Sequence, residues 1–161
     1  MSGEITIYTD GASSGNPGPG GFGAVLISGR HRLEKSAGFR LTTNNRMELM
    51  AVIEGLESLK IAGSKVTVYT DSKYVADSVE KGWVFKWESS GFKKKKNPDL
   101  WIRFLKVYRE HSVRFIWIKG HANNIENERC DRLAVEAYSK KNLLEDTGYN
   151  PEDENNMMFE N

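Results

Sequence analysis

The sequence predicts an α/β fold in a single domain, with both antiparallel and parallel strand pairs in one sheet. The first observation is a repeat: residues 5–10 (ITIYTD) return almost unchanged as residues 66–71 (VTVYTD). β-Branched and aromatic residues dominate both copies, which favours strands. The second observation is a helical pattern between the copies, which allows them to pair in parallel. The third is the length of 161 residues, enough for one domain with a sizeable core.

The first half of the chain predicts an antiparallel meander followed by a helix. Residues 22–28 and 33–41 favour two strands joined near Gly29. The Gly- and Pro-rich residues 11–23 predict a tight, exposed loop before them.

Residues 43–60 predict a helix that ends before Gly63, with Asn44 or Asn45 as its N-cap. Apolar residues recur at helical spacing along one side: Leu49, Val52, Ile53, Leu56 and Leu59. Glu48 falls three residues after Asn45, so a capping-box glutamate is one interpretation of that residue.

The second half predicts a short helix after Asp71, a helix over 99–110 capped by Asp99, a strand over 113–118 and a helix over about 127–140. We expect a catalytic domain over residues 1–149 and a disordered acidic tail over 150–161.

The charge is balanced in total but unevenly distributed. The formal net charge is +1, yet residues 81–96 carry six Lys against one Glu. Residues 145–161 carry six Asp or Glu and neither Lys nor Arg. Trp83 and Trp87 lie within the basic segment, a combination that favours contact with a polyanion, although a solvated lysine loop is the simpler interpretation.

The sequence carries no pattern typical of a membrane or secreted protein. No apolar run approaches the ~18 residues of a membrane span, and residues 1–4 lack the features of a signal peptide. Cys130 is the only cysteine, so no internal disulfide can form. We therefore expect a cytoplasmic protein that does not bind a membrane.

Four carboxylates follow strands or lie near helix starts: Asp10, Glu48, Asp71 and Asp131. In an open α/β sheet, such positions converge beyond the carboxyl ends of the strands. Each acid alone has an ordinary explanation as a turn, cap or surface residue. Together they predict a site for hard cations such as Mg²⁺ or Mn²⁺, and a pair of such ions suits phosphodiester cleavage.

Several motifs in order, from about Ile5 to Tyr149, resemble bacterial type I ribonuclease H. They are YTDG at 8–11, GNPGPGG at 15–21, TNNRMEL at 43–49, TDS at 70–72, GHA at 120–122 and NERCD at 127–131. The resemblance implies a ribonuclease H-like fold, a five-stranded mixed sheet with helices on both faces. It also implies an endonuclease that hydrolyses the RNA strand of RNA–DNA hybrids with two Mg²⁺ ions, or Mn²⁺ in their place, leaving 5′-phosphate and 3′-hydroxyl ends.

The resemblance also assigns site residues. It implies that Asp10, Glu48 and Asp71 hold one ion, that Asp10 and Asp131 hold the second, and that His121 assists proton transfer or product release. It implies a substrate-binding set over the hybrid and a basic protrusion at about 81–97: Gly11, Ser13, Asn16, Thr43, Asn44, Asn45, Lys73, Trp83, Trp87, Lys93, Lys94, Lys95 and Lys96. Lys73 stands where glutamine is frequent. Ser13, Phe92 and Asn123 replace a frequent Cys, a Trp and a Gly.

Two alternatives share this fold: a binding module without chemistry, and a nuclease or strand-transfer enzyme that acts on DNA. The complete set of acids argues against the first. The motifs at 15–21 and 43–48 favour the hybrid over DNA. We expect the active form to be a monomer.

Overall fold

The computed structural model describes residues 4–120 and 124–152. The predicted roles of His121 and Asn123, and most of the predicted tail, lie outside these residues. In chain order the elements are β1 (Ile5–Ser13), β2 (Gly18–Ser28), β3 (His31–Thr42), α1 (Asn44–Glu57), β4 (Lys65–Thr70), α2 (Lys73–Glu80), α3 (Trp83–Ser89), α4 (Pro98–Tyr108), β5 (Ser112–Trp117) and α5 (Ile125–Tyr138).

The strands form one mixed sheet in the order β3-β2-β1-β4-β5. β1 is the central strand, antiparallel to β2 and parallel to β4, and β4 is parallel to β5. The repeated segments pair residue for residue, so Tyr8 lies opposite Tyr69 and their rings stack with centroids 5.0 Å apart. The predicted five-stranded mixed sheet is confirmed.

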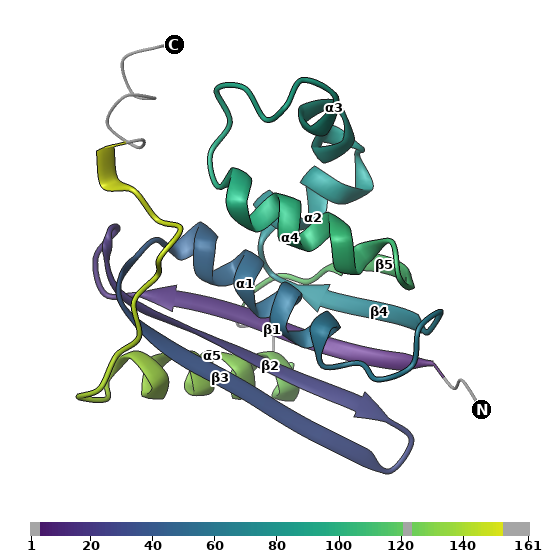
Figure 1. Cartoon of the computed structure of the whole chain (residues 1–161). Coiled ribbons are helices and arrows are strands. Elements are labelled where there is room, and N and C mark those ends of the chain that lie inside the picture. Colours follow the sequence, from purple (N-terminus) through teal and green to yellow (C-terminus); the bar gives the residue numbers. More distant parts are fainter. Residues whose placement is uncertain (1–3, 121–123, 153–161) are drawn as a thin grey trace.

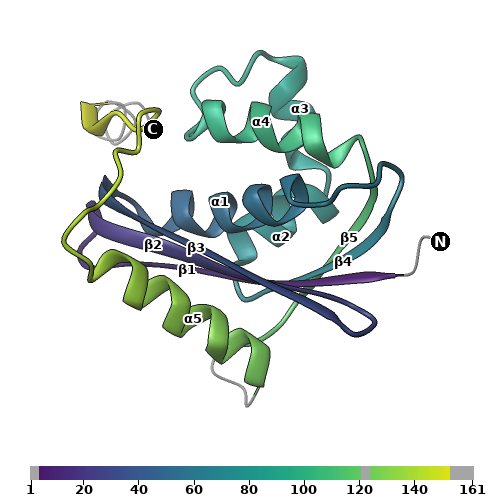
Figure 2. The ribbon, with the colours of Figure 1, turned by 60° about the horizontal axis from the view of Figure 1, so that its bottom comes forward.

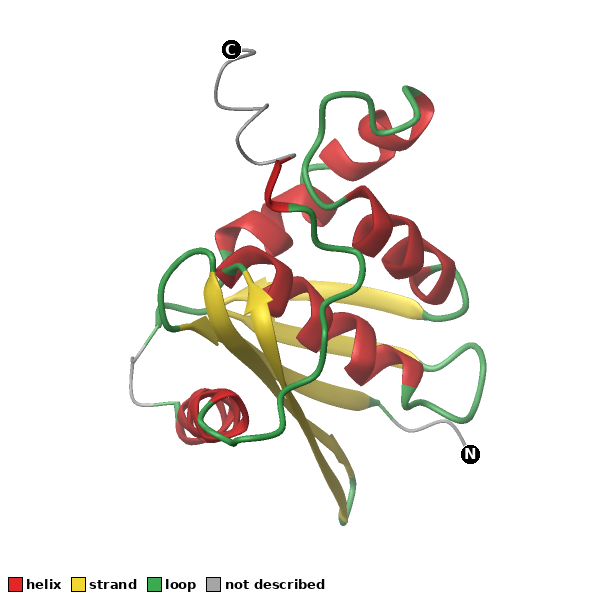
Figure 3. Ribbon diagram, turned by 60° about the vertical axis from the view of Figure 1, so that its left-hand side comes forward, coloured by secondary structure: helices red, strands yellow, loops and turns green. Residues whose placement is uncertain are grey.

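Helices cover both faces of the sheet, as predicted. α1, α2 and α4 lie on one side, and α5 lies on the other (Figures 1 and 2). Figure 3 shows α5 nearly end-on, separated by the strands from the other helices. The main core fills the α1 side and includes the fully buried Ile7, Val68 and Trp101. The sheet edge at which β1 and β4 both end is therefore flanked by helices from both layers.

The glycine-rich segment is mostly strand, which corrects the predicted loop over residues 11–23. β1 continues to Ser13 and β2 begins at Gly18. The reason is tertiary packing that composition does not reveal. A Cβ atom on Gly23 would lie 2.3 Å from the carbonyl oxygen of Cys130, so glycine lets α5 pack directly against the strand backbone. This close packing brings the side chains of α5 near β1.

The N-cap of α1 is Thr43, rather than the predicted Asn44 or Asn45. The Thr43 hydroxyl accepts a hydrogen bond from the backbone N–H of Arg46 at 3.3 Å. Counted from this cap, Glu48 lies beyond the third helical position, where a capping-box glutamate belongs. The capping-box interpretation of Glu48 is therefore wrong, and its buried side chain needs another explanation.

Arg46 is a buried cation at the start of α1, 1% exposed. It donates two hydrogen bonds to Asp146, at 2.7 and 2.9 Å, and two to Asp99, at 2.9 and 2.7 Å. Its Nη1 also donates to Asn97 at 3.3 Å. Asp99 was predicted to cap α4, but the cap position belongs to Asn97, and the carboxylate of Asp99 pairs with Arg46 instead. The buried guanidinium is thus paired on two sides.

The segment after α5 fastens the sheet edge to α1. The Leu144 N–H donates to the Gly38 carbonyl at 2.9 Å, and the Arg40 N–H donates to the Leu144 carbonyl at 2.8 Å. Farther along, Asp146 reaches Arg46. In Figure 1 this segment is the yellow chain that runs from α5 past the sheet edge toward α1.

Replacing Asp146 by Asn will destabilise the fold strongly, because a buried cation loses one of its two anionic partners. We expect the free energy of unfolding to fall by about 3 kcal/mol, measured by urea denaturation. Glu145→Gln is the matched control. Its partner is Arg40, and both side chains are about two-thirds exposed, so the change should stay within about 0.5 kcal/mol. Equal losses of unfolding free energy in both variants would show that the buried pairs of Arg46 contribute no more to stability than the exposed Arg40–Glu145 pair.

Candidate active site

Three carboxylates from three different elements meet at one edge of the sheet. Asp10 lies on β1, Glu48 on α1, and Asp71 directly follows β4. One oxygen from each lies within 4.8 Å of the others. Asp10 and Glu48 are each 5% exposed. The structure therefore brings together three of the four acids that the sequence singled out.

Asp131 approaches the same site from the opposite face of the sheet. It lies on α5 next to Cys130, whose thiol donates to the carbonyl oxygen of Tyr8 at 3.2 Å. The negative charge of Asp131 raises the pKa of Asp10. Asp131 is thus close enough to act on the site electrostatically, although it is not within the group of three.

Burial and mutual repulsion raise the pKa values of the clustered acids. Burial, then the charges of Asp71 and Asp131, raise the pKa of Asp10 to about 8. The pKa of Glu48 is also raised, first by burial and then by Asp10 and Asp71. Without a cation, the cluster therefore tends to hold protons at neutral pH.

The site fits a hard divalent cation. The Oε2 atom of Glu48 is buried, and among the described residues it has no hydrogen-bond partner. A buried, unsatisfied carboxylate oxygen is costly. Carboxylate oxygens are the preferred protein ligands of Mg²⁺ and Mn²⁺, so an ion held by Asp10, Glu48 and Asp71 would satisfy this atom.

Gly11 allows β1 and α1 to approach closely enough to form the site. A Cβ atom there would lie 2.4 Å from the backbone nitrogen of Glu48 and 2.5 Å from the carbonyl carbon of Met47. The Gly11 N–H also donates to Asp10 Oδ1 at 3.0 Å. Gly11 was assigned to substrate contact, and the structure gives it a packing role beside two of the carboxylates.

The predicted hybrid-contacting polar residues lie in two neighbouring segments. Asn16, Asn44 and Asn45 are exposed, and Ser13 is partly exposed at the end of β1. The side-chain oxygen of Asn16 accepts from the Asn44 N–H at 3.0 Å, which joins the two segments. Thr43 is buried, with its hydroxyl used as the α1 cap.

The basic segment forms the short helix α3 and the loop after it. The four lysines at 93–96 are exposed. Trp83 is 40% exposed, whereas Trp87 is partly buried against Trp101 with Lys95 over its ring. Phe92 has a positive φ of 58° and is buried, so its ring serves the core.

Trp117, at the end of β5, was not singled out by the sequence. The alternation of β5 places it on the same face as Val113 and Phe115, which predicts a core residue, yet its side chain is 43% exposed. Its indole N–H donates to the backbone carbonyl of Asp71 at 3.0 Å. The ammonium of Lys73 lies 4.8 Å from the centre of its ring. Only the structure links Trp117 to the backbone of Asp71, one of the clustered acids.

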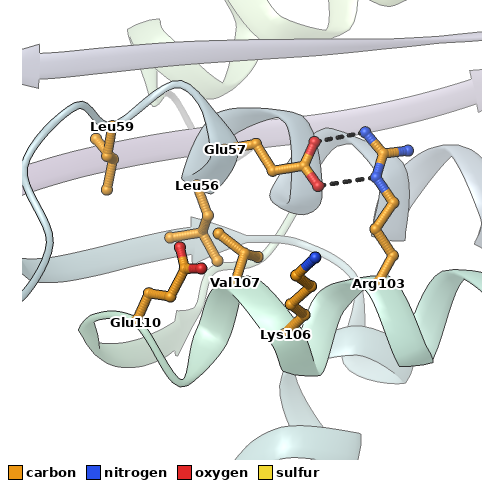
Figure 4. Close-up of a pocket in the computed structure, with 7 residues that line it drawn as sticks. All are labelled: Leu56, Glu57, Leu59, Arg103, Lys106, Val107 and Glu110. Carbon is orange, nitrogen blue, oxygen red and sulfur yellow. Dashed lines mark hydrogen bonds and ion pairs between the residues drawn. The ribbon is translucent and has the colours of Figure 1, made fainter.

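A surface hollow of about 250 Å³ lies away from the carboxylates, between the end of α1 and α4. Leu56 and Val107 line it, and Arg103 pairs with Glu57 at its side (Figure 4). None of its lining residues belongs to the carboxylate group.

Within the described residues, no helix is long and apolar enough to span a bilayer.

Comparison with known proteins identifies the family. The RNase H family model matches residues 2–139. A protein named Ribonuclease H from Trichodesmium erythraeum is 57% identical over 151 residues, covering 91% of this chain and 96% of that protein. Ribonuclease HI from Synechocystis sp. is 52% identical over 152 residues, covering 91% of this chain and 94% of that protein.

Comparison with solved structures points to the same family. The crystal structure of LC9-RNase H1, described as a type 1 RNase H with the type 2 active-site motif, superposes with a TM-score of 0.78 at 31% identity over 86% of this chain and 74% of that one. The structure of LC11-RNase H1 in complex with RNA/DNA hybrid gives a TM-score of 0.64 at 33% identity, over 84% of this chain and 96% of that one. The chain belongs to the RNase H family, and it is a hydrolytic endoribonuclease.

Proposed function

We propose that this enzyme cuts the RNA strand of RNA–DNA hybrids by metal-dependent hydrolysis and leaves 5′-phosphate and 3′-hydroxyl ends. The observation that carries the proposal is the convergence of Asp10, Glu48 and Asp71 within 4.8 Å, two of them buried. A buried cluster of carboxylates is costly without a cation, because burial and mutual repulsion both disfavour the ionised acids. The hybrid-bound structure of LC11-RNase H1 supports the choice of substrate.

The carboxylates would hold two Mg²⁺ ions, or Mn²⁺ in their place. We assign Asp10, Glu48 and Asp71 to one ion and Asp10 with Asp131 to the other. When bound, such ions stabilise the charge on the attacking and leaving oxygens of a phosphodiester displacement. The raised pKa values of Asp10 and Glu48 mean that cation binding displaces protons from the site.

The remaining residues bind and orient the substrate. We propose that Asn16, Asn44 and Asn45 hydrogen-bond in the minor groove, where 2′-hydroxyls distinguish RNA from DNA; their exposure supports this role. We propose that Lys93 to Lys96 contact phosphates of the DNA strand. Water attacks the phosphorus, the bond to the 3′ oxygen breaks, and we assign to His121 the proton that this oxygen gains.

We further propose that the enzyme is a cytoplasmic monomer. Its single thiol, Cys130, is buried and donates to a backbone carbonyl, so the fold is complete with a reduced cysteine.

Substrate comparison tests the proposed function directly. With Mg²⁺, we expect cleavage of an RNA–DNA hybrid and none of matched DNA or RNA duplexes, scored on a sequencing gel with end-group analysis. Asp10→Asn should lower kcat by about a thousandfold or more, because several kcal/mol of transition-state stabilisation is lost, while hybrid affinity stays near wild type. Glu136→Gln, an exposed change on α5, is the control. Substantial turnover by Asp10→Asn would contradict the assignment, and hybrid binding without any cleavage would indicate a binding module.

The pH dependence of stability tests the carboxylate cluster without substrate. The pKa of Asp10 is raised in the folded state, from 3.8 to about 8. Its contribution to stability is therefore complete below about pH 4 and is lost as the pH rises to about 8. In EDTA at pH 8, we expect Asp10→Asn to be more stable than wild type by at least about 1.4 kcal/mol, the equivalent of one pKa unit.

Saturating Mg²⁺ should then stabilise the wild type more than the variant, because only the wild type has the full ligand set. Thermal unfolding with and without EDTA measures both effects. A metal-free wild type that matches or exceeds Asp10→Asn at pH 8 would contradict the proposed repulsion.

The role of the lysine loop can be separated from chemistry. Replacing Lys93 to Lys96 by Gln should raise KM about tenfold or more with little change in kcat. It should also reduce the slope of log(kcat/KM) against log[salt] by up to about 3.6, since each of the four phosphate contacts contributes about 0.7–0.9. A Lys140→Gln/Lys141→Gln variant, altered at exposed positions after α5, is the control. An unchanged slope would restore the interpretation of a solvated loop.

A further inference from the structure

We propose that Trp117 is a positioning residue of this active site. Its indole N–H fixes the backbone carbonyl of Asp71. Its ring face holds the ammonium of Lys73, two residues along the chain from Asp71, and that ammonium binds a backbone phosphate of the nucleic acid. The proposal rests on the proposed function, which it deepens by adding Trp117 and by specifying a phosphate as the group that Lys73 contacts.

Asp71 has little secondary structure of its own to hold it. It lies between the end of β4 at Thr70 and the N-cap of α2 at Ser72. The end of β5 supports it from the side. The Trp117 indole N–H donates to its carbonyl at 3.0 Å, and the Ile118 N–H donates to the Thr70 carbonyl at 2.9 Å.

Gly120 closes the same side of Asp71. A Cβ atom at Gly120 would lie 2.9 Å from Asp71 Oδ2 and 3.7 Å from its carboxyl carbon. The chain from Trp117 to Gly120 therefore hydrogen-bonds the backbone of Asp71 and passes its carboxylate closely enough that a larger residue than glycine would crowd it. Moving this segment would move one of the three clustered acids.

The stability of α2 does not explain why a lysine stands at residue 73. It is the first residue of α2, and a cation there faces the positive end of the helix dipole. Its ammonium lies 4.8 Å from the centre of the Trp117 ring, a distance typical of a cation–π contact. Both side chains are exposed. The indole therefore compensates an unfavourable position and holds a positive charge, accessible to solvent, two residues from Asp71.

The hydrogen bond of Trp117 to Asp71 and its cation–π contact with Lys73 can be tested separately. Trp117→Phe keeps an aromatic face but loses the N–H donor. Lys73→Gln keeps the indole and its hydrogen bond but loses the charge. Trp117→Leu loses both. Arg114→Gln, which removes an exposed positive charge from the same strand toward its other end, is the matched control.

Mg²⁺ affinity without substrate, measured by isothermal titration calorimetry, reports the Asp71 contact. We expect Trp117→Phe and Trp117→Leu to weaken it threefold or more, and Lys73→Gln and Arg114→Gln to leave it unchanged. Wild-type affinity in both Trp117 variants, with folding verified by circular dichroism, would overturn this half of the proposal.

Hybrid cleavage over a salt series reports the Lys73 contact. We expect Lys73→Gln to raise KM about three- to tenfold, to reduce the salt slope by about 0.7–0.9, and to leave kcat unchanged. In the Trp117→Leu background, the same substitution should raise KM less than twofold, because the ammonium is no longer held. An equal effect in both backgrounds, or an unchanged slope, would overturn this half. If wild-type protein fails to cleave hybrid with Mg²⁺, the proposed function fails instead, and the calorimetric result still stands by itself.

Discussion

The structure depends on holding three carboxylates together against burial and mutual repulsion. Asp10, Glu48 and Asp71 come from a central strand, a helix on one face and the end of the neighbouring strand. None of these elements could keep its acid in place alone. The parallel pairing of β1 with β4 fixes two of them side by side, and the contact of Gly11 with the backbone of Glu48 fixes the third. Bringing the acids together lowers the stability of the folded state, and the buried core on the α1 side offsets this cost.

The fold was largely predictable because its main signals are local or repeated. The two copies of the strand motif and the helical stripe between them predict the parallel pair at the centre of the sheet. The failures came from long-range contacts. Residues 11–23 look like loop because glycine usually marks one, whereas here Gly23 admits a helix from more than a hundred residues later. Asp99 looks like a cap because no local pattern reveals that its partner is Arg46.

The chemistry of the site was more visible than its supports. Carboxylates after strand patterns can be recognised from their spacing. The sequence alone therefore predicted that Asp10, Glu48 and Asp71 lie together. Trp117 was invisible because strand alternation assigns it to the core. The role of Asp146 was equally hidden, since it lies in an acidic stretch that begins at Glu145 and resembles a solvated tail, although its side chain is 3% exposed.

The segment around Leu144 has a consequence for the edge of the sheet. β3 is an outer strand, and its unpaired backbone groups could recruit a strand from another molecule. Leu144 occupies the Gly38 carbonyl and the Arg40 N–H, while Arg32, Glu34 and Lys35 place charges farther along the same strand. The chain thus pairs with part of its own β3 edge, which disfavours the addition of a strand from another molecule at this edge.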